Sequence, residues 1–434
     1  MNLTKTLLAL VLLSSLLRAR DDSLRARLKD SHAEGADFWV YNDLAVTLAK
    51  AKRLNRPVFV TFRCVPCKAC AGFDAEVANG NERIRALAES SFVPLRQVEM
   101  KDVDLTQFQF DHDLNWAAMF INADGAVYGR YGTQSAAGPD AYNSIASLEK
   151  AMQRVLKLHA VYPKNAAALA GKRAAPKPYQ TALEMPGLQN KEKLSGLTAR
   201  GNCIHCHNIH DAENAQWQSS GQFKWEMLYR YPLPDNVGLH IDPQDGCKIE
   251  RVEAGSPAAK AELQAGDSVT HVNGQPIISI ADIQWVLHHL PNTLATVQIT
   301  ATRDGHASTR TLQLAPDWKQ SDISWRGSIW SLKPRPGFWT VIANEEQMKN
   351  LPLPAGSKPL RVQGINNNIN EGRSARQAGL REGDLITHVG DKLLTAAPKD
   401  FTVYLKQNYR VGDKLPLTLL RNGQTQRIEV PLVE

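Results

Sequence analysis

The chain has 434 residues, of which 43% are apolar and 22% charged, so its composition is that of an ordinary globular protein. This length exceeds what one hydrophobic core usually supports, and we expect several domains of roughly 100–150 residues. The formal net charge of +7 comes from Lys and Arg residues that are scattered along the chain. Because nucleic-acid binding needs a basic stripe or patch, nucleic acid is excluded from the expected partners.

Residues 1–19 have the layout of a secretory signal. Lys5 precedes an apolar run that ends at Leu17, and this run is short for a membrane span. The residues before Ala19 fit the small-residue rule of a cleavage site poorly, so a short membrane anchor is the alternative. We therefore expect a periplasmic or otherwise extracytoplasmic protein, with membrane association through the N-terminus if the segment is retained.

Residues 37–160 alternate predicted helices and strands in the order of a thioredoxin-like α/β domain. An amphipathic stretch over 44–54 precedes the apolar PVFVTF that begins at Pro57, and CVPCKACAGF follows directly. FVPLRQVEM indicates another strand, and AAMFINADGAVYGRYG indicates a hairpin that turns at Asp124 and Gly125.

Cys64 and Cys67 are the predicted catalytic residues of this domain. Cys64 stands at a strand-to-helix junction, where unpaired amides and the helix dipole favour the thiolate that attacks a disulfide. Cys67 follows one turn later and is placed to resolve the mixed disulfide. Cys70 lies one turn further and is either a third participant or a small buried side chain. A structural disulfide or a metal site is the alternative for the pair.

Three regions follow residue 160. Residues 161–200 are rich in Ala, Lys, Pro and Gly and are predicted to be a linker. Residues 223–318 and 319–434 contain two copies of a small strand-rich module, because SPAAKAELQAGDSVTHVNGQPI resembles RSARQAGLREGDLITHVGDKLL. Asp267 and Asp384 occupy equivalent places in the two copies.

The segment 201–222 lies between the linker and the repeats. Its Cys203, Cys206 and His207 have the CxxCH spacing of a c-type haem attachment site, in which His207 is an axial ligand of the haem iron. Covalent haem is therefore the one cofactor expected. A second redox dithiol and a zinc site that uses the histidines of GNCIHCHNIH remain open as alternatives.

FRCVPCKACAGFDAEVA, the INADGAVYGRYG hairpin, CIHCH and the two repeats together resemble a bacterial family of exported thioredoxin/PDZ proteins, some of which are selenoproteins. The resemblance implies a multidomain fold class, with an α/β thioredoxin-like domain, a short CxxCH segment and two mostly β, α+β PDZ-like domains. Thioredoxins carry a cis-proline before the strand that faces the CxxC motif, where this chain has Trp116 and Ala117. A dedicated partner is therefore expected rather than general thioredoxin substrates.

The first repeat resembles the PDZ domains of periplasmic proteases. By this resemblance, ADIQWVLHHL is the groove helix, and Val237, Gly238, Leu239 and His240 form the loop that binds the C-terminal carboxylate of a peptide. The second repeat has a less recognisable loop. No GxSxG motif or other nucleophilic serine context is present in the sequence, so a protease is not expected.

These features predict an exported thiol-disulfide oxidoreductase that uses Cys64 and Cys67. Its PDZ-like repeats would bind protein C-termini and so hold disulfide-containing clients near the dithiol. Two alternatives are a non-enzymatic PDZ scaffold, in which the dithiol is structural, and a haem electron-transfer protein with a degenerate thioredoxin domain. The direction of exchange depends on the surroundings of the sulfurs and is not predicted.

Overall fold

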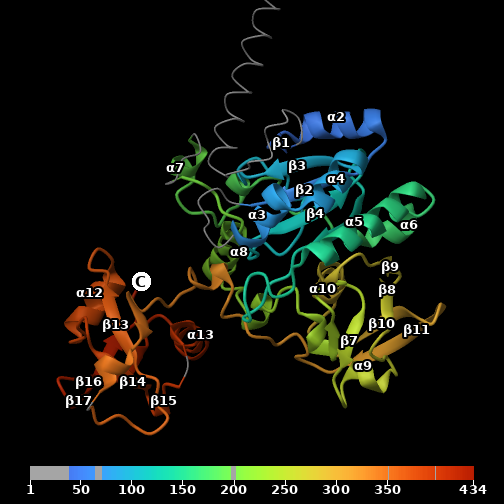
Figure 1. The fold of residues 1–434 in the computed structure, drawn as a ribbon. Coiled ribbons are helices and arrows are strands. Elements are labelled where there is room, and N and C mark those ends of the chain that lie inside the picture. Colours follow the sequence, from blue (N-terminus) through green and yellow to red (C-terminus); the bar gives the residue numbers. More distant parts are fainter. Residues whose placement is uncertain (1–38, 64–70, 197–201, 350, 396) are drawn as a thin grey trace, which may run out of the picture. The chain divides into compact units, whose positions relative to one another are not determined.

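The computed structural model describes residues 39–63, 71–196, 202–349, 351–395 and 397–434 (Figure 1). The predicted signal segment and Cys64, Cys67 and Cys70 lie outside these residues. The chain forms two compact units, each of which combines two stretches of sequence. Unit 1 consists of Met1–Ala212 and Glu226–Ser321, and unit 2 of Glu213–Trp225 and Asp322–Glu434.

The N-terminal part of unit 1 is built on a five-stranded sheet with the strand order β1-β3-β2-β4-β5. The strands β1, β2 and β3 are parallel, whereas β4 is antiparallel to β2 and β5 is antiparallel to β4. The elements are β1 (Val40–Tyr41), α2 (Leu44–Leu54), β2 (Val58–Phe62), α3 (Ala71–Ala75), the π-helix η2 (Glu76–Gly80), α4 (Glu82–Ser91), β3 (Val93–Gln97), β4 (Ala117–Ile121), β5 (Val127–Tyr131) and α5 (Ile145–Ala160).

β2 is the central strand of this sheet, and all of its residues are buried. Val60 and Phe62 belong to the core on one face and Phe59 to the core on the other, as the two-residue period of a strand requires. Both faces are therefore apolar and must be covered. The helices α4 and α5 cover the face of Phe59, where Ile84 and Leu148 are almost fully buried.

The opposite face of the sheet is covered in part by residues 161–212, which we expected to be a linker and a separate CxxCH segment. Apolar side chains of this segment enter the core, and Met185, Ile204 and Ile209 are fully buried there. Their irregular spacing and the Ala- and Pro-rich composition hide this packing in the sequence. The helices of this segment are α6 (Ala166–Leu169), η3 (Ala170–Lys172), η4 (Ala182–Glu184), α7 (Lys191–Ser195) and the first part of α8 (His207–Ser219).

The first repeat completes unit 1. It has a four-stranded sheet in the order β11-β10-β8-β9 and a two-stranded sheet of β6 and β7. The elements are η5 (Trp225–Leu228), η6 (Pro234–Val237), β6 (Leu239–Ile241), β7 (Ile249–Val252), α9 (Pro257–Lys260), β8 (Ser268–Val272), β9 (Gln275–Pro276), α10 (Ile280–His289), β10 (Ala295–Arg303) and β11 (His306–Leu314).

The second repeat forms most of unit 2, and its sheet has the order β12-β13-β14-β16-β17, with β15 paired to β14. The edge strand β12 pairs with β13 along one side only among the described strands. The elements are η7 (Gly327–Ile329), β12 (Phe338–Ile342), α11 (Glu345–Met348), β13 (Leu360–Ile365), α12 (Asn370–Gln377), β14 (Leu385–Val389), β15 (Lys392–Leu393), α13 (Pro398–Asn408), β16 (Lys414–Arg421) and β17 (Gln424–Pro431).

The two repeats share an ion pair with a buried carboxylate at the position that their sequences match. The carboxylate of Asp267 accepts two hydrogen bonds from Arg303, at 2.6 and 2.8 Å. The carboxylate of Asp384 accepts two from Arg421, at 2.6 and 2.7 Å. The structure therefore gives the two equivalent aspartates one common role, which is to tie the start of a strand to the hairpin beside it.

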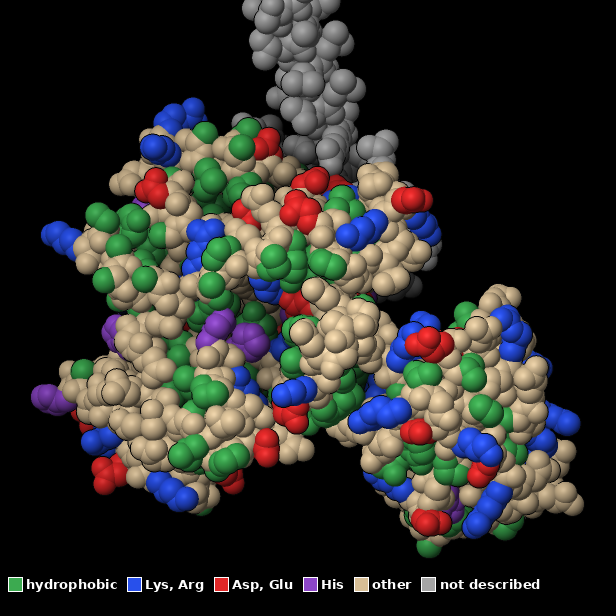
Figure 2. Space-filling model, turned by 180° about the vertical axis from the view of Figure 1, so that it is seen from behind, with side chains coloured by type: hydrophobic (Ala, Val, Ile, Leu, Met, Phe, Trp, Pro, Cys, Tyr) green, Lys and Arg blue, Asp and Glu red, His purple; other side chains and the backbone are tan. Residues whose placement is uncertain are grey.

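The surface carries charges of both signs. On the face drawn in Figure 2, Lys and Arg side chains are interspersed with Asp and Glu side chains over each unit. Within the described ranges, no helix combines the length and the apolar character that crossing a membrane requires.

Candidate functional site

A buried ionic cluster lies at the end of β2, where the CxxC segment begins. Asp74 accepts a two-pronged hydrogen bond from Arg96, at 2.9 and 3.0 Å, and pairs with Arg63 at 3.1 Å. The indole of Trp116 donates to the same carboxylate at 3.0 Å. Arg63 directly precedes Cys64 in the sequence, and Asp74 follows Cys70 by four residues. The cluster therefore fixes the chain on both sides of the predicted redox motif, and Trp116 takes part in it.

A row of neighbouring rings, packed in tilted and edge-to-face pairs, connects the end of β2 to α8. The centroids of Phe62 and Phe110 are 4.6 Å apart, those of Phe110 and His112 are 4.3 Å apart, and those of His112 and His210 are 5.4 Å apart. Phe62 stands two residues before Cys64, and His210 stands four residues after Cys206. The structure thus brings the CxxCH segment to the edge of the sheet from which the CxxC segment starts.

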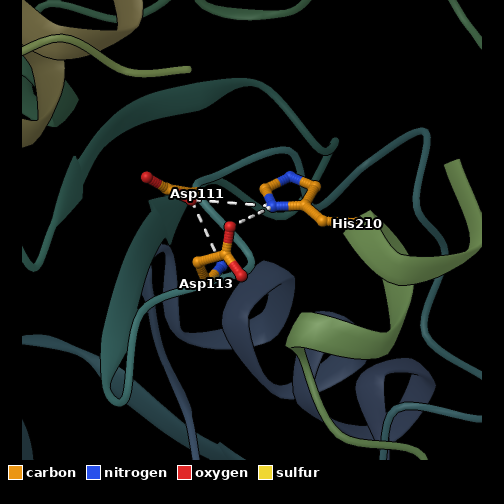
Figure 3. A group of neighbouring side chains, drawn as sticks. All are labelled: Asp111, Asp113 and His210. Atoms are coloured by element: carbon orange, nitrogen blue, oxygen red, sulfur yellow. Dashed lines mark hydrogen bonds and ion pairs between the residues drawn. The ribbon is translucent and has the colours of Figure 1, made fainter. Parts of the chain in front are cut away.

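His210 ends this row in a buried group with two aspartates (Figure 3). Its Nδ1 lies 3.0 Å from an oxygen of Asp113 and 3.8 Å from one of Asp111. The backbone amide of Asp113 donates to Asp111 at 3.2 Å. Two carboxylates and one imidazole can form an ion pair or coordinate a divalent cation. The sequence analysis missed the aspartates, because they lie far from His210 along the chain.

Cys203 and Cys206 are buried, with 8% and 7% of their surfaces exposed. Cys206 belongs to the core under the sheet, together with Ile204 and Ile209. The sulfur of Cys203 lies 3.8 Å from the carbonyl oxygen of Ile204. Both sulfurs are therefore enclosed by protein, and Cys206 directly precedes the first residue of α8, where the helix dipole favours a thiolate.

His207 lies in a different environment. Its Nδ1 is 3.0 Å from Asp211, its ring stacks on that of His205 at 5.5 Å, and 41% of its side chain is exposed. A covalently bound haem needs both sulfurs and this imidazole around one cavity. The described residues do not fit that arrangement, because the sulfurs lie in the core and the imidazole lies at the surface. Haem at Cys203, Cys206 and His207 stays a prediction.

The predicted carboxylate-binding loop of the first repeat lies between η6 and β6. Val237 and Leu239 are fully buried, and Gly238 has φ of 86°, a left-handed conformation that favours glycine. The amide of Gly238 donates to the carbonyl of Asp235 at 2.9 Å. His240 pairs with the carboxylate of Asp235 at 2.8 Å. The loop thus lies directly before the strand β6, as expected. One of its amides, that of Gly238, is already bonded to a carbonyl of the same chain.

The corresponding loop of the second repeat was missed in the sequence. Gly337 has φ of 72° and precedes Phe338 and Trp339 at the start of β12, as Gly238 precedes Leu239 and His240 at the start of β6. The connection from β12 to β13 is longer than that from β6 to β7 and contains α11, so equal spacing between the repeats does not reveal the loop. The signal that could have found it is PGFW, a glycine between apolar residues after RP.

Models of known families match three regions of the chain. A thioredoxin-like model matches residues 39–123, and two PDZ domain models match residues 248–299 and 347–432. The chain is therefore an N-terminal thioredoxin-like domain followed by two PDZ domains, which confirms the predicted fold class. We call the first repeat PDZ1 and the second PDZ2.

Several curated relatives are described as probable proteases. A "Probable periplasmic serine endoprotease DegP-like" of Pseudomonas savastanoi pv. phaseolicola is 31% identical over 206 residues, which are 46% of this chain and 40% of that protein. The protein of the same description from Pseudomonas fluorescens is 30% identical over 208 residues, with the same two shares. The chain thus spans less than half the length of these relatives.

Among solved structures, the HtrA3 PDZ domain bound to a phage-derived ligand (FGRWV) matches 23% of this chain and 84% of that chain. The sequence identity is 16% and the TM-score is 0.18.

Proposed function

We propose that the protein is an extracytoplasmic thiol-disulfide oxidoreductase of the bacterial thioredoxin/PDZ type, with Cys64 and Cys67 as its working dithiol. One observation carries the proposal: the central strand of a thioredoxin-like sheet leads directly into the CxxC segment, beside a cluster in which two guanidinium groups meet one carboxylate. Positive charge near a cysteine favours its thiolate, which is the form that attacks disulfides.

The exchange takes two steps. The thiolate of Cys64 attacks one sulfur of a client disulfide, which forms a mixed disulfide and releases the other client sulfur as a thiolate that takes up a proton. Cys67, as a thiolate, then attacks the Cys64 sulfur, so that a Cys64–Cys67 disulfide forms and the second client thiol leaves. The client gains two electrons and two protons, and the protein dithiol loses them. The reverse sequence oxidises a client dithiol.

For Cys203 and Cys206 we favour thiol chemistry over haem. The CxxC spacing of this pair, and the place of Cys206 directly before α8, support a second dithiol that exchanges with the first. In such a transfer a thiolate of the second pair attacks the Cys64–Cys67 disulfide and forms a mixed disulfide with one of its sulfurs, and the other cysteine of the second pair then attacks that mixed disulfide. Cys64 and Cys67 leave reduced, and a Cys203–Cys206 disulfide is formed.

The compartment and the role of the PDZ domains complete the proposal. The signal-like N-terminus and the periplasmic description of the relatives support a location outside the cytoplasm, where disulfides persist. The sequence of this chain contains no nucleophilic serine motif such as GxSxG. We therefore infer that the property shared with those relatives is recruitment of protein C-termini rather than proteolysis.

The first experiment is reduction of insulin disulfides by the exported full-length protein. We expect activity in the wild type and its loss in Cys64→Ser. Cys67→Ser should accumulate mixed disulfides on Cys64 that are seen on non-reducing gels. Cys247→Ser is the matched control and should keep full activity, because this thiol is 1% exposed in PDZ1. If Cys64→Ser exchanges as fast as the wild type, the dithiol is not the working group and the scaffold function replaces this proposal.

The second experiment separates haem from thiol chemistry at the CxxCH segment. A haem stain and a visible spectrum of the exported protein should be negative. Free thiols are then counted in the fully reduced and in the oxidised protein. The oxidised protein should have four fewer, because Cys64, Cys67, Cys203 and Cys206 are all oxidised to disulfides. A covalent haem band would sink the second dithiol and restore the haem prediction.

A further inference from the structure

We infer that protein C-termini bind PDZ2 and not PDZ1, because the groove region of PDZ1 is filled by the protein's own chain. The inference rests on the proposed recruitment of a protein partner through the PDZ domains. It assigns that recruitment to one of the two domains and names the chemistry of the partner, a free C-terminus with apolar last residues.

The groove helix of PDZ1, α10, is buried on all sides. Each of the eight consecutive residues from Ile280 to Leu287 is at most 8% exposed. A helix that packs only on its own domain buries one stripe, because its period of 3.6 residues turns the other residues to solvent. Something other than the PDZ1 core must therefore cover the remaining faces of α10.

The thioredoxin-like domain covers one of these faces. Asp282 of α10 accepts from the Lys172 ammonium at 2.8 Å and from the Arg130 amide at 3.1 Å. The indole of Trp285 donates to the carbonyl of Gly171 at 2.9 Å, and the guanidinium of Arg130 lies 3.5 Å from the Trp285 ring centroid. These polar contacts are buried and exclude water from this face of α10. A peptide therefore has no room along this face.

Two tyrosines of the chain complete the cover. Tyr231, which precedes the loop, donates its amide to His288 at 3.3 Å, and its carbonyl accepts from Gln284 at 2.7 Å. Its ring stacks on that of His288 with centroids 4.2 Å apart. One residue of the chain thus contacts one turn of α10 with both of its backbone groups and with its ring, and covers this end of the helix.

Tyr142 reaches PDZ1 from the thioredoxin-like domain. It packs against the apolar cluster to which Val237, Leu239 and Ile283 belong. The cavity that remains beside it, lined also by Gly246 and other residues of both domains, measures about 10 Å³, which is the space of about one water molecule. The apolar surface of PDZ1 at this point is therefore already used.

Each loop has an ion pair beside it. In PDZ1 the carboxylate of Asp235 lies 2.8 Å from His240. In PDZ2 the guanidinium of Arg335, two positions before Gly337, lies 2.9 Å from the carboxylate of Glu371. These pairs do not distinguish the two domains, whose difference lies in how far the groove helix and the strand beside it are covered.

Among the described residues, PDZ2 has an exposed edge strand and a groove helix that is less enclosed than α10. Among the described residues of its groove helix α13, only Phe401, Leu405 and Lys406 are buried, which is one face. The edge strand β12 exposes 51% of Trp339 and 57% of Ile342. Large apolar side chains on an edge strand are unusual unless another strand adds to that edge. The occupant that fits is an extended C-terminal peptide with apolar side chains.

The test is binding of a fluorescein-labelled peptide with a free C-terminal carboxylate to the full-length protein. The peptide is selected from a library of random C-termini, and its amidated form is the control. We expect one site per chain that requires the carboxylate. Trp339→Ala should raise Kd at least about tenfold, as loss of an aromatic anchor does. His240→Ala, at the matched position of PDZ1, should change Kd less than about twofold, a difference near experimental error.

A third variant tests the closure itself. Tyr142→Ala removes one of the side chains that cover PDZ1, so a second, weaker peptide site per chain should become detectable at high peptide concentration. Circular dichroism checks that each variant is folded. Carboxylate-dependent binding that is lost in His240→Ala and kept in Trp339→Ala overturns the inference, as do two sites in the wild type or no carboxylate-dependent site at all. Reduction of a small disulfide such as that of oxidised glutathione needs no PDZ domain, so its failure would count against the proposed function alone.

Discussion

PDZ1 and PDZ2 are copies of one module, but different segments of the chain pack against them. Each has an aspartate that is held by an arginine of the neighbouring hairpin, Asp267 with Arg303 and Asp384 with Arg421. The groove helix of PDZ1 is enclosed by the thioredoxin-like domain, whereas that of PDZ2 has one buried face. The comparison teaches that sequence repetition preserves the inner framework of a module, while its binding surface depends on what packs against it.

The largest expected effect comes from Asp282, the third residue of α10. Asp282→Ala should lower the opening free energy of unit 1 by about 3–5 kcal/mol, because it leaves the buried Lys172 without its partner. Hydrogen exchange followed by mass spectrometry measures this in peptides of unit 1. The matched control is Asp400→Ala, the third residue of α13, which caps the amide of Ala397 at 2.9 Å. It should cost unit 2 only about 1 kcal/mol. Equal costs in both units would contradict the difference between the two helices.

The next effect tests the framework that the two domains share. Asp267→Ala and Asp384→Ala should each destabilise their own unit by about 1–3 kcal/mol, since each removes a carboxylate that accepts hydrogen bonds from an arginine and from a backbone amide. The same exchange measurement, made on peptides of β8 and β14, checks the two costs. A cost confined to one domain would show that the ion pair is not a common structural element.

A smaller, pH-dependent effect belongs to PDZ2. Burial lowers the pKa of Lys406 to about 7, and its ammonium bonds to carbonyl oxygens of Leu332 and Pro334. The unfolded chain therefore binds more protons between pH 7 and about 10.5, so the stability of unit 2 should rise with pH across this window. We expect a gain of about 1–2 kcal/mol between pH 7 and pH 9 that disappears in Lys406→Met. Exchange rates corrected for their intrinsic pH dependence measure it. A gain that persists in Lys406→Met belongs to another group.

The smallest effect uses Cys247 as a reporter of PDZ1. Burial raises the pKa of this thiol to about 12, so alkylation at pH 8 requires local opening of the domain. Tyr142→Ala should speed alkylation of Cys247 by a few-fold, about 1 kcal/mol or less, as judged by mass spectrometry of the labelled peptide. Trp339→Ala should leave the rate unchanged. If Trp339→Ala speeds labelling as much, the reporter does not distinguish the two domains.

The sequence predicted the features that have a local signal. The apolar strand before Cys64 and the matching positions of Asp267 and Asp384 follow from short patterns with a known period or spacing, whereas the loop around Gly238 was assigned by resemblance to PDZ domains. The thioredoxin-like and PDZ domains that these patterns predicted are confirmed. The site assignments at Cys64 and Cys67 stay predictions, because those residues lie outside the described structure.

The features that the sequence did not predict are contacts between distant segments. Lys172 and Asp282 are 110 positions apart, and His210 and Asp113 are 97 positions apart. No sequence pattern connects the two residues of either pair, because the contact is made by a single side chain on each segment. Composition was misleading for residues 161–200, where a few apolar side chains among Ala, Lys and Pro are enough to anchor the segment.

The cover of the thioredoxin-like sheet by residues 161–212 determines when this domain can fold. Translation and export both proceed from the N-terminus, so the five strands are complete before Met185, Ile204 and Ile209 have emerged. During that interval the face of Val60 and Phe62 lacks part of its cover and is open to chaperones or to aggregation. An expression fragment that stops at Ala160 would hold the protein permanently at this stage, whereas one that extends to Ala212 supplies the missing layer.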